Sequence, residues 1–174
     1  MKYTFLFAYL LITSPSLSAQ WTTLPVPFAT RYDDIFFIND TLGWAVNSNG
    51  SILHTTDAGA SWTEQEDTDK YLRSIEFATP TLGFCGSLDF GFYRTTDGGL
   101  HWDDITGHID PMPSGICGLA APTQEVIYGC GVWSSPAFVI KSTDGGTTWV
   151  STDMSAHASA LVDMYFVSAD TGFV

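Results

Sequence analysis

The sequence has 174 residues, of which 19 are acidic and six are lysine or arginine, so the formal net charge at pH 7 is −13. This charge argues against nucleic acid or an anionic membrane surface as a partner, because both repel an acidic protein. The 16 glycines and the 14% aromatic content are typical of a β-rich chain with many tight turns.

Residues 1–19 are expected to form a secretory signal peptide. Lys2 supplies the positive start, residues 5–12 form the apolar centre, and residues 16–19 offer a cleavage site made of small residues. The apolar centre is too short to span a bilayer comfortably, and a retained anchor is the alternative. We therefore expect bacterial export, to the periplasm, the cell surface or the medium, without membrane insertion after cleavage.

One turn motif, Ser/Thr-x-Asp-x-Gly-x-x-Trp, occurs three times after this leader, and we call each copy a box. Its aspartate and hydroxyl side chains can bond nearby backbone amides, and its glycine tolerates a positive φ. Its tryptophan brings a large apolar surface to the next strand. The box residues are Thr55, Asp57, Gly59 and Trp62, then Thr95, Asp97, Gly99 and Trp102, and finally Ser142, Asp144, Gly146 and Trp149.

The boxes recur with a roughly constant period. Their aspartates are 40 and 47 residues apart, and Gly43 and Gly83 each lie 14 residues before a box aspartate. Each period holds four short strand-like runs separated by turn residues. Four antiparallel strands in about 40 residues are typical of one blade of a β-propeller. The sequence therefore predicts an all-β propeller with blades at about 31–66, 71–106 and 114–153, and the start of a fourth at 160–174.

These motifs resemble the Asp-box (BNR) repeats of sialidases, sortilin-type receptors and some glycoside hydrolases. The combination of Leu-Gly-Trp/Phe with Thr-Thr-Asp-Gly-Gly-x-x-Trp is most similar to secreted propellers of the photosystem II stability and assembly factor type. The resemblance covers roughly residues 21–174. It implies that the box is a structural corner at the blade rim, and that the protein is an assembly-factor-like module.

The predicted propeller is incomplete. Four to eight blades of this size need roughly 160–320 residues, whereas residues 20–174 carry three boxes and the opening strands of a fourth blade. Residues 21–24 resemble a strand that follows a box and could close the ring by joining the last blade. We expect the sequence to be a piece of a longer protein, whose remaining blades would cover the open faces.

Three cysteines occur in this exported chain. Cys117 and Cys130 fall on the first two strands of the third blade and would face each other across a hairpin, so that a disulfide is geometrically possible. The alternative is that these two and Cys85 are small buried thiols.

Catalytic, metal and cofactor sites are not expected. A calcium loop needs several oxygens close together, whereas each box offers one carboxylate. The neighbouring carboxylates Asp33 and Asp34 would point to opposite faces of an extended strand, so they would not form a glycosidase dyad. The four histidines show no ligand spacing. A glycan-active or glycan-binding propeller, sialidase-like or of another glycoside hydrolase type, is the alternative function.

A partner-binding surface is the favoured functional prediction. The third period is seven residues longer than the others, and its extra residues fall in 108–114 and around 133–136. Both insertions would lie on the propeller face opposite the boxes, where acidic and aromatic residues gather. The predicted partner is a protein, with a glycan as the alternative, and a neutral loop insertion would leave no site. The candidate binding residues are Asp67, Asp69, Tyr71, Phe90, His108 and Trp133.

Overall fold

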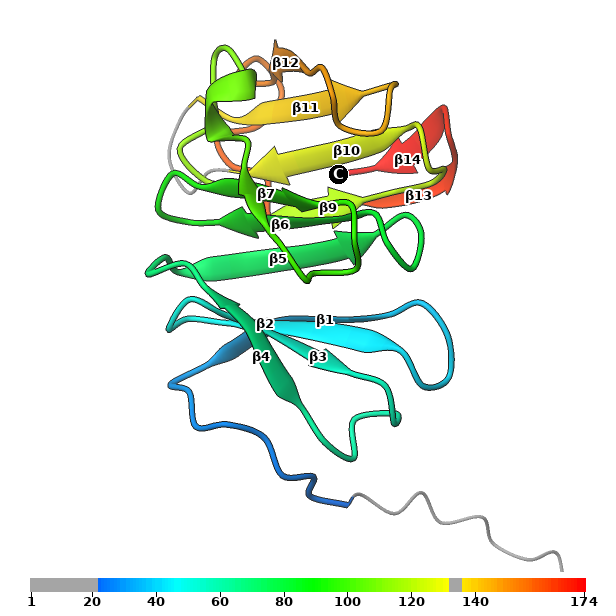
Figure 1. Ribbon diagram of the computed structural model, residues 1–174. Coiled ribbons are helices and arrows are strands. Elements are labelled where there is room, and N and C mark those ends of the chain that lie inside the picture. The colour runs from blue at the N-terminus through cyan, green and yellow to red at the C-terminus, as the bar shows by residue number, and fades with distance from the viewer. Residues whose placement is uncertain (1–21, 132–135) are drawn as a thin grey trace, which may run out of the picture.

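The computed structural model describes residues 22–131 and 136–174, so the expected signal peptide lies outside the described residues. Within those two ranges the chain forms 14 β-strands, one short 3-10 helix, η1 (Thr106–His108), and no α-helix. The strands form three four-stranded antiparallel sheets and one two-stranded sheet (Figure 1). The all-β fold of three blades and the start of a fourth is therefore confirmed.

Each sheet is a meander whose strand order follows the sequence. The first blade holds β1 (Tyr32–Phe37), β2 (Gly43–Asn47), β3 (Ser51–Thr55) and β4 (Thr63–Asp67). The second holds β5 (Leu72–Phe77), β6 (Gly83–Ser87), β7 (Phe92–Thr95) and β8 (Asp103–Asp104). The third holds β9 (Gly118–Ala120), β10 (Ile127–Gly131), β11 (Phe138–Ser142) and β12 (Val150–Asp153). The fourth consists of β13 (Tyr165–Ser168) and β14 (Thr171–Phe173).

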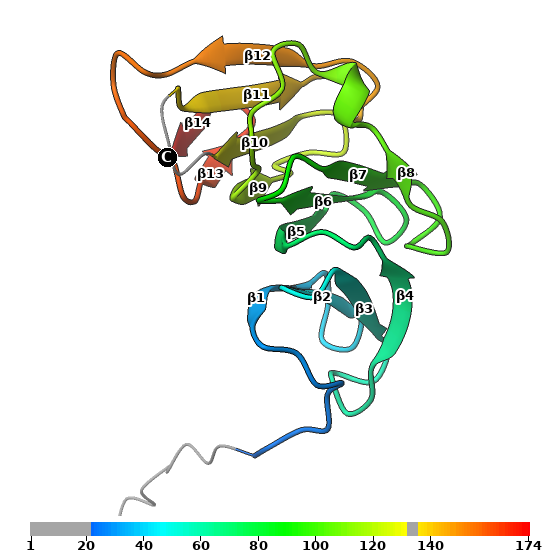
Figure 2. The same ribbon diagram turned by 90° about the vertical axis from the view of Figure 1, so that its left-hand side faces the viewer.

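The blades fan out with their first strands inside. Figure 2 shows β1 and β5 on the inner side of their sheets, with β4 and β8 outside. Hydrogen bonds join the inner strands of the first two blades, and join the second blade to the residues that precede β9 in the third. The amide of Ile75 donates to Asp34 Oδ2 at 2.9 Å, and Ser74 Oγ donates to the carbonyl of Ile116 at 3.1 Å. These bonds hold successive blades in register along the axis of the fan.

Aromatic side chains fill the space between successive blades. The ring of Trp44, on the second strand of the first blade, stacks on Phe77 of the second blade with centroids 3.5 Å apart. Tyr128 of the third blade stacks in the same way on Phe166 of the fourth, at 3.9 Å. The second strand of each of these blades thus carries an aromatic residue that packs on the first strand of the next blade.

A glycine precedes three of the second-strand aromatic residues for a steric reason. A Cβ atom at Gly83 would lie 2.4 Å from the ring of Phe77, because that ring covers the backbone of its strand neighbour. We call Gly43, Gly83 and Gly172 the landmark glycines, and each is covered by a phenylalanine ring in the same way. The Gly-Trp/Phe pattern of the sequence therefore marks the position at which one blade meets the next.

Candidate functional site

The boxes form closed turns at one end of the blades. In the first box Thr55 Oγ1 donates to Asp57 Oδ1 at 2.8 Å and accepts from the amide of Gly59 at 2.9 Å. Asp57 also accepts from the amide and the hydroxyl of Ser61, at 2.8 and 2.6 Å. The second and third boxes repeat this pattern around Asp97 and Asp144. Each box carboxylate is therefore engaged by donors of its own turn.

These hydrogen bonds lower the pKa of all three box carboxyls. Side-chain donors, above all Ser61 for Asp57 and Thr148 for Asp144, lower the pKa from 3.8 to about 2. Asp97 reaches the same value through His101, whose Nδ1 lies 2.6 Å from Asp97 Oδ2. Among the described residues no three histidine, cysteine or acidic side chains gather as a metal site would require. The geometry agrees with a structural role for the box.

Acidification should therefore destabilise the protein through the boxes. A carboxyl whose pKa is lowered by folding contributes stability that is present above its unfolded pKa of about 3.8 and is lost as the pH falls towards 2. The stability contribution of His101 depends on pH in the opposite direction, because Asp97 raises the pKa of this histidine. That contribution is present at low pH and is lost as the pH rises through the raised pKa. Carboxyl titrations followed by NMR would check this, and ordinary pKa values at all three aspartates would contradict it.

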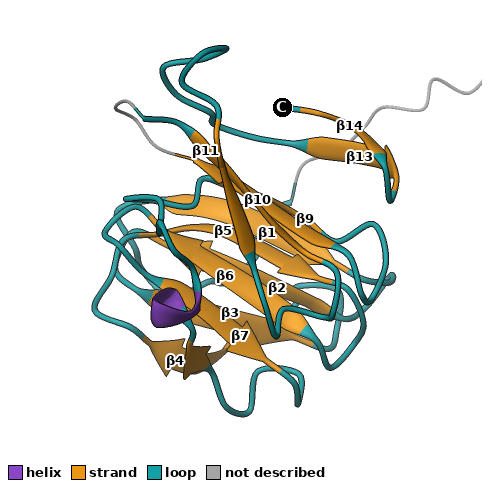
Figure 3. Cartoon of the chain, turned by 90° about the horizontal axis from the view of Figure 1, so that it is seen from above, coloured by secondary structure: helices purple, strands orange, loops and turns teal. Residues whose placement is uncertain are grey.

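The other end of the blades carries the predicted binding residues. We define the loop face as the connections β4–β5, β6–β7 and β8–β9, which lie on the left of Figure 1. Figure 3 shows, from above, that loops gather at both ends of the stacked strands. The boxes occupy one of these ends and the loop face occupies the other.

Hydrogen bonds donated by main-chain amides connect the three loops of this face. The amide of Tyr71 donates to Asp89 Oδ2 at 3.0 Å, and the amide of Leu88 donates to the carbonyl of Tyr71 at 2.8 Å. The amide of Phe90 donates to the carbonyl of Ser114 at 3.1 Å. The loop face is thus cross-linked by its main-chain amides and the Asp89 carboxylate, and it presents its side chains from a fixed backbone.

The structure brings most of the predicted residues onto this face. Phe90 has a φ of +58° and is 55% exposed, so an apolar ring is presented in a left-handed conformation that bulky residues seldom adopt. Asp69 has a φ of +54°, and its amide donates to Asp67 Oδ1 at 3.2 Å. His108 is exposed at the end of η1. Trp133 lies outside the described residues.

Two residues that contact this face were not among the six candidate binding residues: Arg31, which precedes β1, and Asp89, whose loop 88–90 was expected on this face. Arg31 lies over the ring of Tyr71, 6.0 Å from its centroid, and forms an ion pair with the buried Asp33 at 2.6 Å. Asp89 joins two loops through the amide of Tyr71. The position of Asp89 next to Phe90 is the one sequence feature that could have predicted its place in the loop face. No sequence pattern predicts the contact between Arg31 and Tyr71.

Two carboxyls on inner strands have raised pKa values, and both accept hydrogen bonds from backbone amides. Burial raises the pKa of Glu76 to about 7, and Glu76 Oε1 accepts from the amide of Ala121 at 3.4 Å. Burial also raises the pKa of Asp34, which accepts from the amides of Ile35 and Ile75. The strand register shifts at Asp33, so the simple alternation expected for Asp33 and Asp34 does not hold there.

The two cysteines of the third blade are neighbours. The amide of Cys117 donates to the carbonyl of Cys130 at 2.7 Å. Burial, followed by the proximity of Cys117, raises the pKa of the Cys130 thiol to about 12. Cys85 is fully buried elsewhere, in the core between the first two blades. The disulfide between Cys117 and Cys130 stays a prediction.

Within the described residues no helix is long and apolar enough to cross a bilayer.

Comparisons with known proteins agree with the blade geometry. The family model described as "Photosynthesis system II assembly factor YCF48" matches residues 13–107. A curated relative, "Photosystem II assembly lipoprotein Ycf48" of Synechococcus sp. (strain CC9902), is 26% identical over 139 residues, which are 76% of this chain and 40% of the relative. The chain therefore spans about 40% of the length of that relative.

Two solved structures have the same fold as this chain. "YCF48 from Cyanidioschyzon merolae" has a TM-score of 0.61 at 22% identity, over 76% of this chain and 40% of its own. "YCF48 bound to D1 peptide" has a TM-score of 0.59 at 22% identity, over 72% and 42%. The two likenesses show the fold, and the family model spans more than half of the sequence. The chain accordingly belongs to the YCF48 family of photosynthesis system II assembly factors.

Proposed function

We propose that this chain is part of an exported, non-enzymatic propeller that binds a segment of a client protein on its loop face during assembly of a larger complex. The observation that carries the proposal is Phe90, an exposed aromatic ring held in a left-handed conformation between loops that are hydrogen-bonded to one another. A solved member of the family is described as bound to a D1 peptide.

The loop face has the features of a preorganised interface. Exposed aromatic side chains act as anchors in many protein interfaces, and an anchor on a fixed backbone loses little conformational entropy when it binds. The backbones that carry Phe90 and Tyr71 are connected through Asp89 and Leu88, so both rings project from a fixed main chain. We infer that they contact apolar or aromatic residues of the client.

The charge of the face indicates the chemistry of that client. Asp69 and Asp89 are exposed on the loops that carry the two rings, and Asp67 is exposed at the end of β4, whereas Arg31 lies over the ring of Tyr71. Carboxylates at the rim of an interface attract basic partners and speed their association. The proposed client is therefore a protein segment that combines basic with aromatic or aliphatic residues, rather than an acidic segment.

Export is supported by the leader-like composition of residues 1–19 and by the description of the curated relative as a lipoprotein. The destination that we propose is the periplasm or the outer surface of a bacterial membrane. Fractionation of cells that express the native reading frame would check it, and a product that remains in the cytoplasm with an intact N-terminus would contradict it.

Binding can be tested with fluorescent synthetic peptides in basic, neutral and acidic versions of one amphipathic sequence. The basic version should bind best, and added salt should weaken it. Phe90→Ala should weaken binding about tenfold or more, because it removes the anchoring ring. Leu100→Ala is the matched control, since Leu100 is a 74% exposed apolar residue on the turn of the second box.

Three outcomes would count against the proposal. Equal binding of the acidic and basic peptides would contradict the argument from charge. An equal loss of peptide affinity in Phe90→Ala and Leu100→Ala would show that the loop face is not the binding site. Hydrolysis or specific retention of glycans would instead support the glycan-active or glycan-binding alternative.

A further inference from the structure

A hollow of about 370 Å³ lies between the second and third blades, beside the third box. Arg94 on β7 and Leu82, on the connection between β5 and β6, line it from the second blade. Gly145 of the third box and Glu125, on the connection between β9 and β10, line it from the third blade. Both blades have all four strands, so blades of a longer chain are not needed to form the walls of this hollow, which we call the Arg94 hollow.

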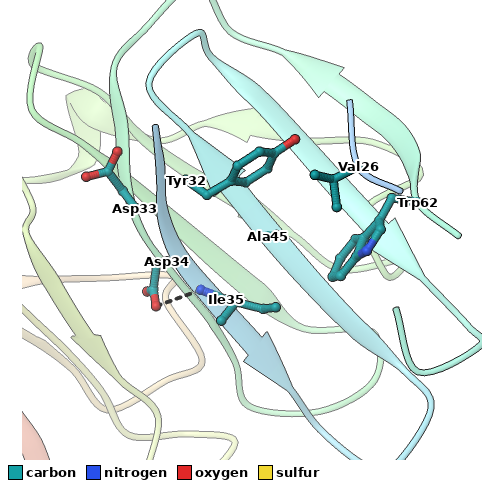
Figure 4. A pocket seen from close by; sticks show the side chains of 7 residues that line it. All are labelled: Val26, Tyr32, Asp33, Asp34, Ile35, Ala45 and Trp62. Atoms are coloured by element: carbon teal, nitrogen blue, oxygen red, sulfur yellow. Dashed lines mark hydrogen bonds between the residues drawn. The ribbon is translucent and has the colours of Figure 1, made fainter. Parts of the chain in front are cut away.

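The pocket drawn in Figure 4, about 290 Å³ in volume, has a different origin. Ile35 on β1 points towards Trp62, and Val26 lies beside that indole ring. Ile35 is 58% exposed, whereas its counterpart on β5, Ile75, is 2% exposed because the first blade packs on it. We expect a preceding blade of the longer protein to pack on Ile35 in the same way, so this pocket is assigned to a blade and not to a ligand.

The third box presents an unpaired acceptor at the Arg94 hollow. The carbonyl of Gly145 accepts no hydrogen bond from the described residues. Its counterpart in the second box, the carbonyl of Gly98, accepts from Trp44 Nε1 at 3.4 Å and from Gln65 Nε2 at 3.0 Å. In the second blade Phe84 stands at the position of Trp44, and an isoleucine stands at the position of Gln65. Neither of these side chains can donate a hydrogen bond, so the carbonyl of Gly145 is left without the partners that Gly98 has.

Arg94 presents an unpaired donor at the same hollow. Its side chain is half-buried, and its Nε–H is fully buried without a hydrogen-bond partner. Among the described residues its guanidinium forms no ion pair, although Asp103 stands opposite it on β8. A buried polar group without a partner is unfavourable, and a ligand that pairs with it recovers that free energy. The hollow therefore offers a donor on one wall and an acceptor on the other.

The charges around the hollow indicate a neutral ligand. Glu125 and Asp144 also line it, and both are exposed, so they repel an anion that Arg94 alone would attract. A primary carboxamide carries one N–H side and one carbonyl oxygen on the same planar group, which suits an acceptor and a donor that face each other. Gln65 provides the precedent, because its carboxamide N–H donates to the carbonyl of Gly98 between the first two blades.

We propose that the Arg94 hollow binds a primary carboxamide, such as the side chain of glutamine. The carboxamide N–H donates to the carbonyl of Gly145, and the carboxamide oxygen accepts from Arg94 Nε. Leu82 contacts the methylene groups that precede the carboxamide. The volume of the hollow lies in the range of small-molecule sites, roughly 300–1,000 Å³. This site lies at the box end of the blades and does not rest on the function proposed for the loop face.

Amide and guanidinium NMR signals of the chain, followed during titrations, test the proposal. The probes are propionamide and two peptides with acetyl and methylamide ends, one with the sequence Ala-Gln-Ala and the other with Ala-Glu-Ala. We expect saturable shifts at Gly145 and at Arg94 Nε–H with the glutamine peptide. The glutamate peptide should bind about tenfold more weakly or less, because it cannot donate to Gly145 and is repelled by Glu125. Saturation by propionamide would identify a free small molecule as sufficient, and saturation by the glutamine peptide alone would identify a peptide segment as the ligand.

Substitutions of Arg94 distinguish its hydrogen bond from its charge. Arg94→Met and Arg94→Lys should each weaken the glutamine peptide about tenfold or more, because both remove the Nε–H donor and only the second keeps the charge. Lys141→Met is the matched control, since Lys141 also precedes a box hydroxyl but lies outside the hollow, and it should leave affinity unchanged. Circular dichroism would confirm that each variant is folded.

Four results would overturn the proposal. They are the absence of saturable shifts with every probe, equal binding of the two peptides, undiminished binding in Arg94→Lys, and equal losses in Arg94→Met and Lys141→Met. Saturable shifts at the hollow with maltose, in the absence of binding by the carboxamides, would also overturn it and would indicate a glycan site. Loss of peptide binding in Phe90→Ala would not affect this site, so the two proposals can fail separately.

Discussion

Replacing Trp44 by alanine should lower the free energy of unfolding by about 3–5 kcal/mol, the usual cost of truncating a buried aromatic side chain to a methyl group. Trp44 is fully buried, stacks on Phe77 and donates its indole N–H to the carbonyl of Gly98 at 3.4 Å. The substitution would open a cavity between the first two blades. It would also remove both the ring stack on Phe77 and the hydrogen bond to Gly98. Urea unfolding followed by far-ultraviolet circular dichroism would measure the loss.

Trp44→Phe provides the comparison if the alanine variant does not fold. Phenylalanine, which the second blade has at the equivalent position as Phe84, keeps a ring over Phe77 but removes the N–H donor. We expect a clearly smaller loss than for alanine. Equal losses in the two variants would mean that the ring stack does not contribute, and a loss below about 1 kcal/mol in Trp44→Ala would contradict the inter-blade packing itself.

Replacing Gly146 by alanine should destabilise the protein by about 2–5 kcal/mol, because two separate costs fall on one residue. Gly146 has a φ of +79°, which L-amino acids with a side chain rarely adopt. Its new Cβ atom would also lie 2.4 Å from the ring of the fully buried Phe84, so the ring or the turn would have to move. Thermal unfolding of the variant beside the native sequence would measure the effect.

Gly107→Ala is the matched control for this prediction. No heavy atom lies within 4 Å of a Cβ placed on Gly107, and its φ is not positive. Alanine there should leave stability unchanged or raise it by up to about 1 kcal/mol, by restricting the unfolded chain. Similar losses in Gly107→Ala and Gly146→Ala would show that the contact between the third box and Phe84 is not what makes the glycine necessary.

The two ends of each blade have different roles in this account. The carboxylates of the boxes accept hydrogen bonds from donors of their own turns. The loop face keeps exposed carboxylates and rings on a backbone that is fixed by contacts between loops. Variable loops on a repeated scaffold are a common way to carry binding in propellers and other repeat folds. A substitution in a box should therefore change stability first, and a substitution at Phe90 should change binding first.

The number and the composition of the blades could be predicted because they depend on local chemistry. A box needs a hydroxyl, a carboxylate and a glycine within five residues, and the hydrogen bonds of its hydroxyl and carboxylate close between Thr55 and Ser61. Strand lengths were less predictable, since they depend on pairing. The fourth strand-like run of the second period was expected at about His101–Ile105, but β8 contains only Asp103–Asp104, which pair with β7.

The sequence alone determined the repeat, its box turns and the aromatic residue that follows each landmark glycine, because each of these depends on residues close together in the chain. Only the tertiary structure decided which copies of a repeated residue are buried. Phe37 and Phe77 occupy equivalent positions, yet one is 39% and the other 3% exposed. The reason is that burial in a propeller comes from the neighbouring blade, as between Trp44 and Gly98, which are 54 residues apart. The link between Tyr71 and Asp89, which are 18 residues apart and lie in different loops, could not be read from the sequence for the same reason.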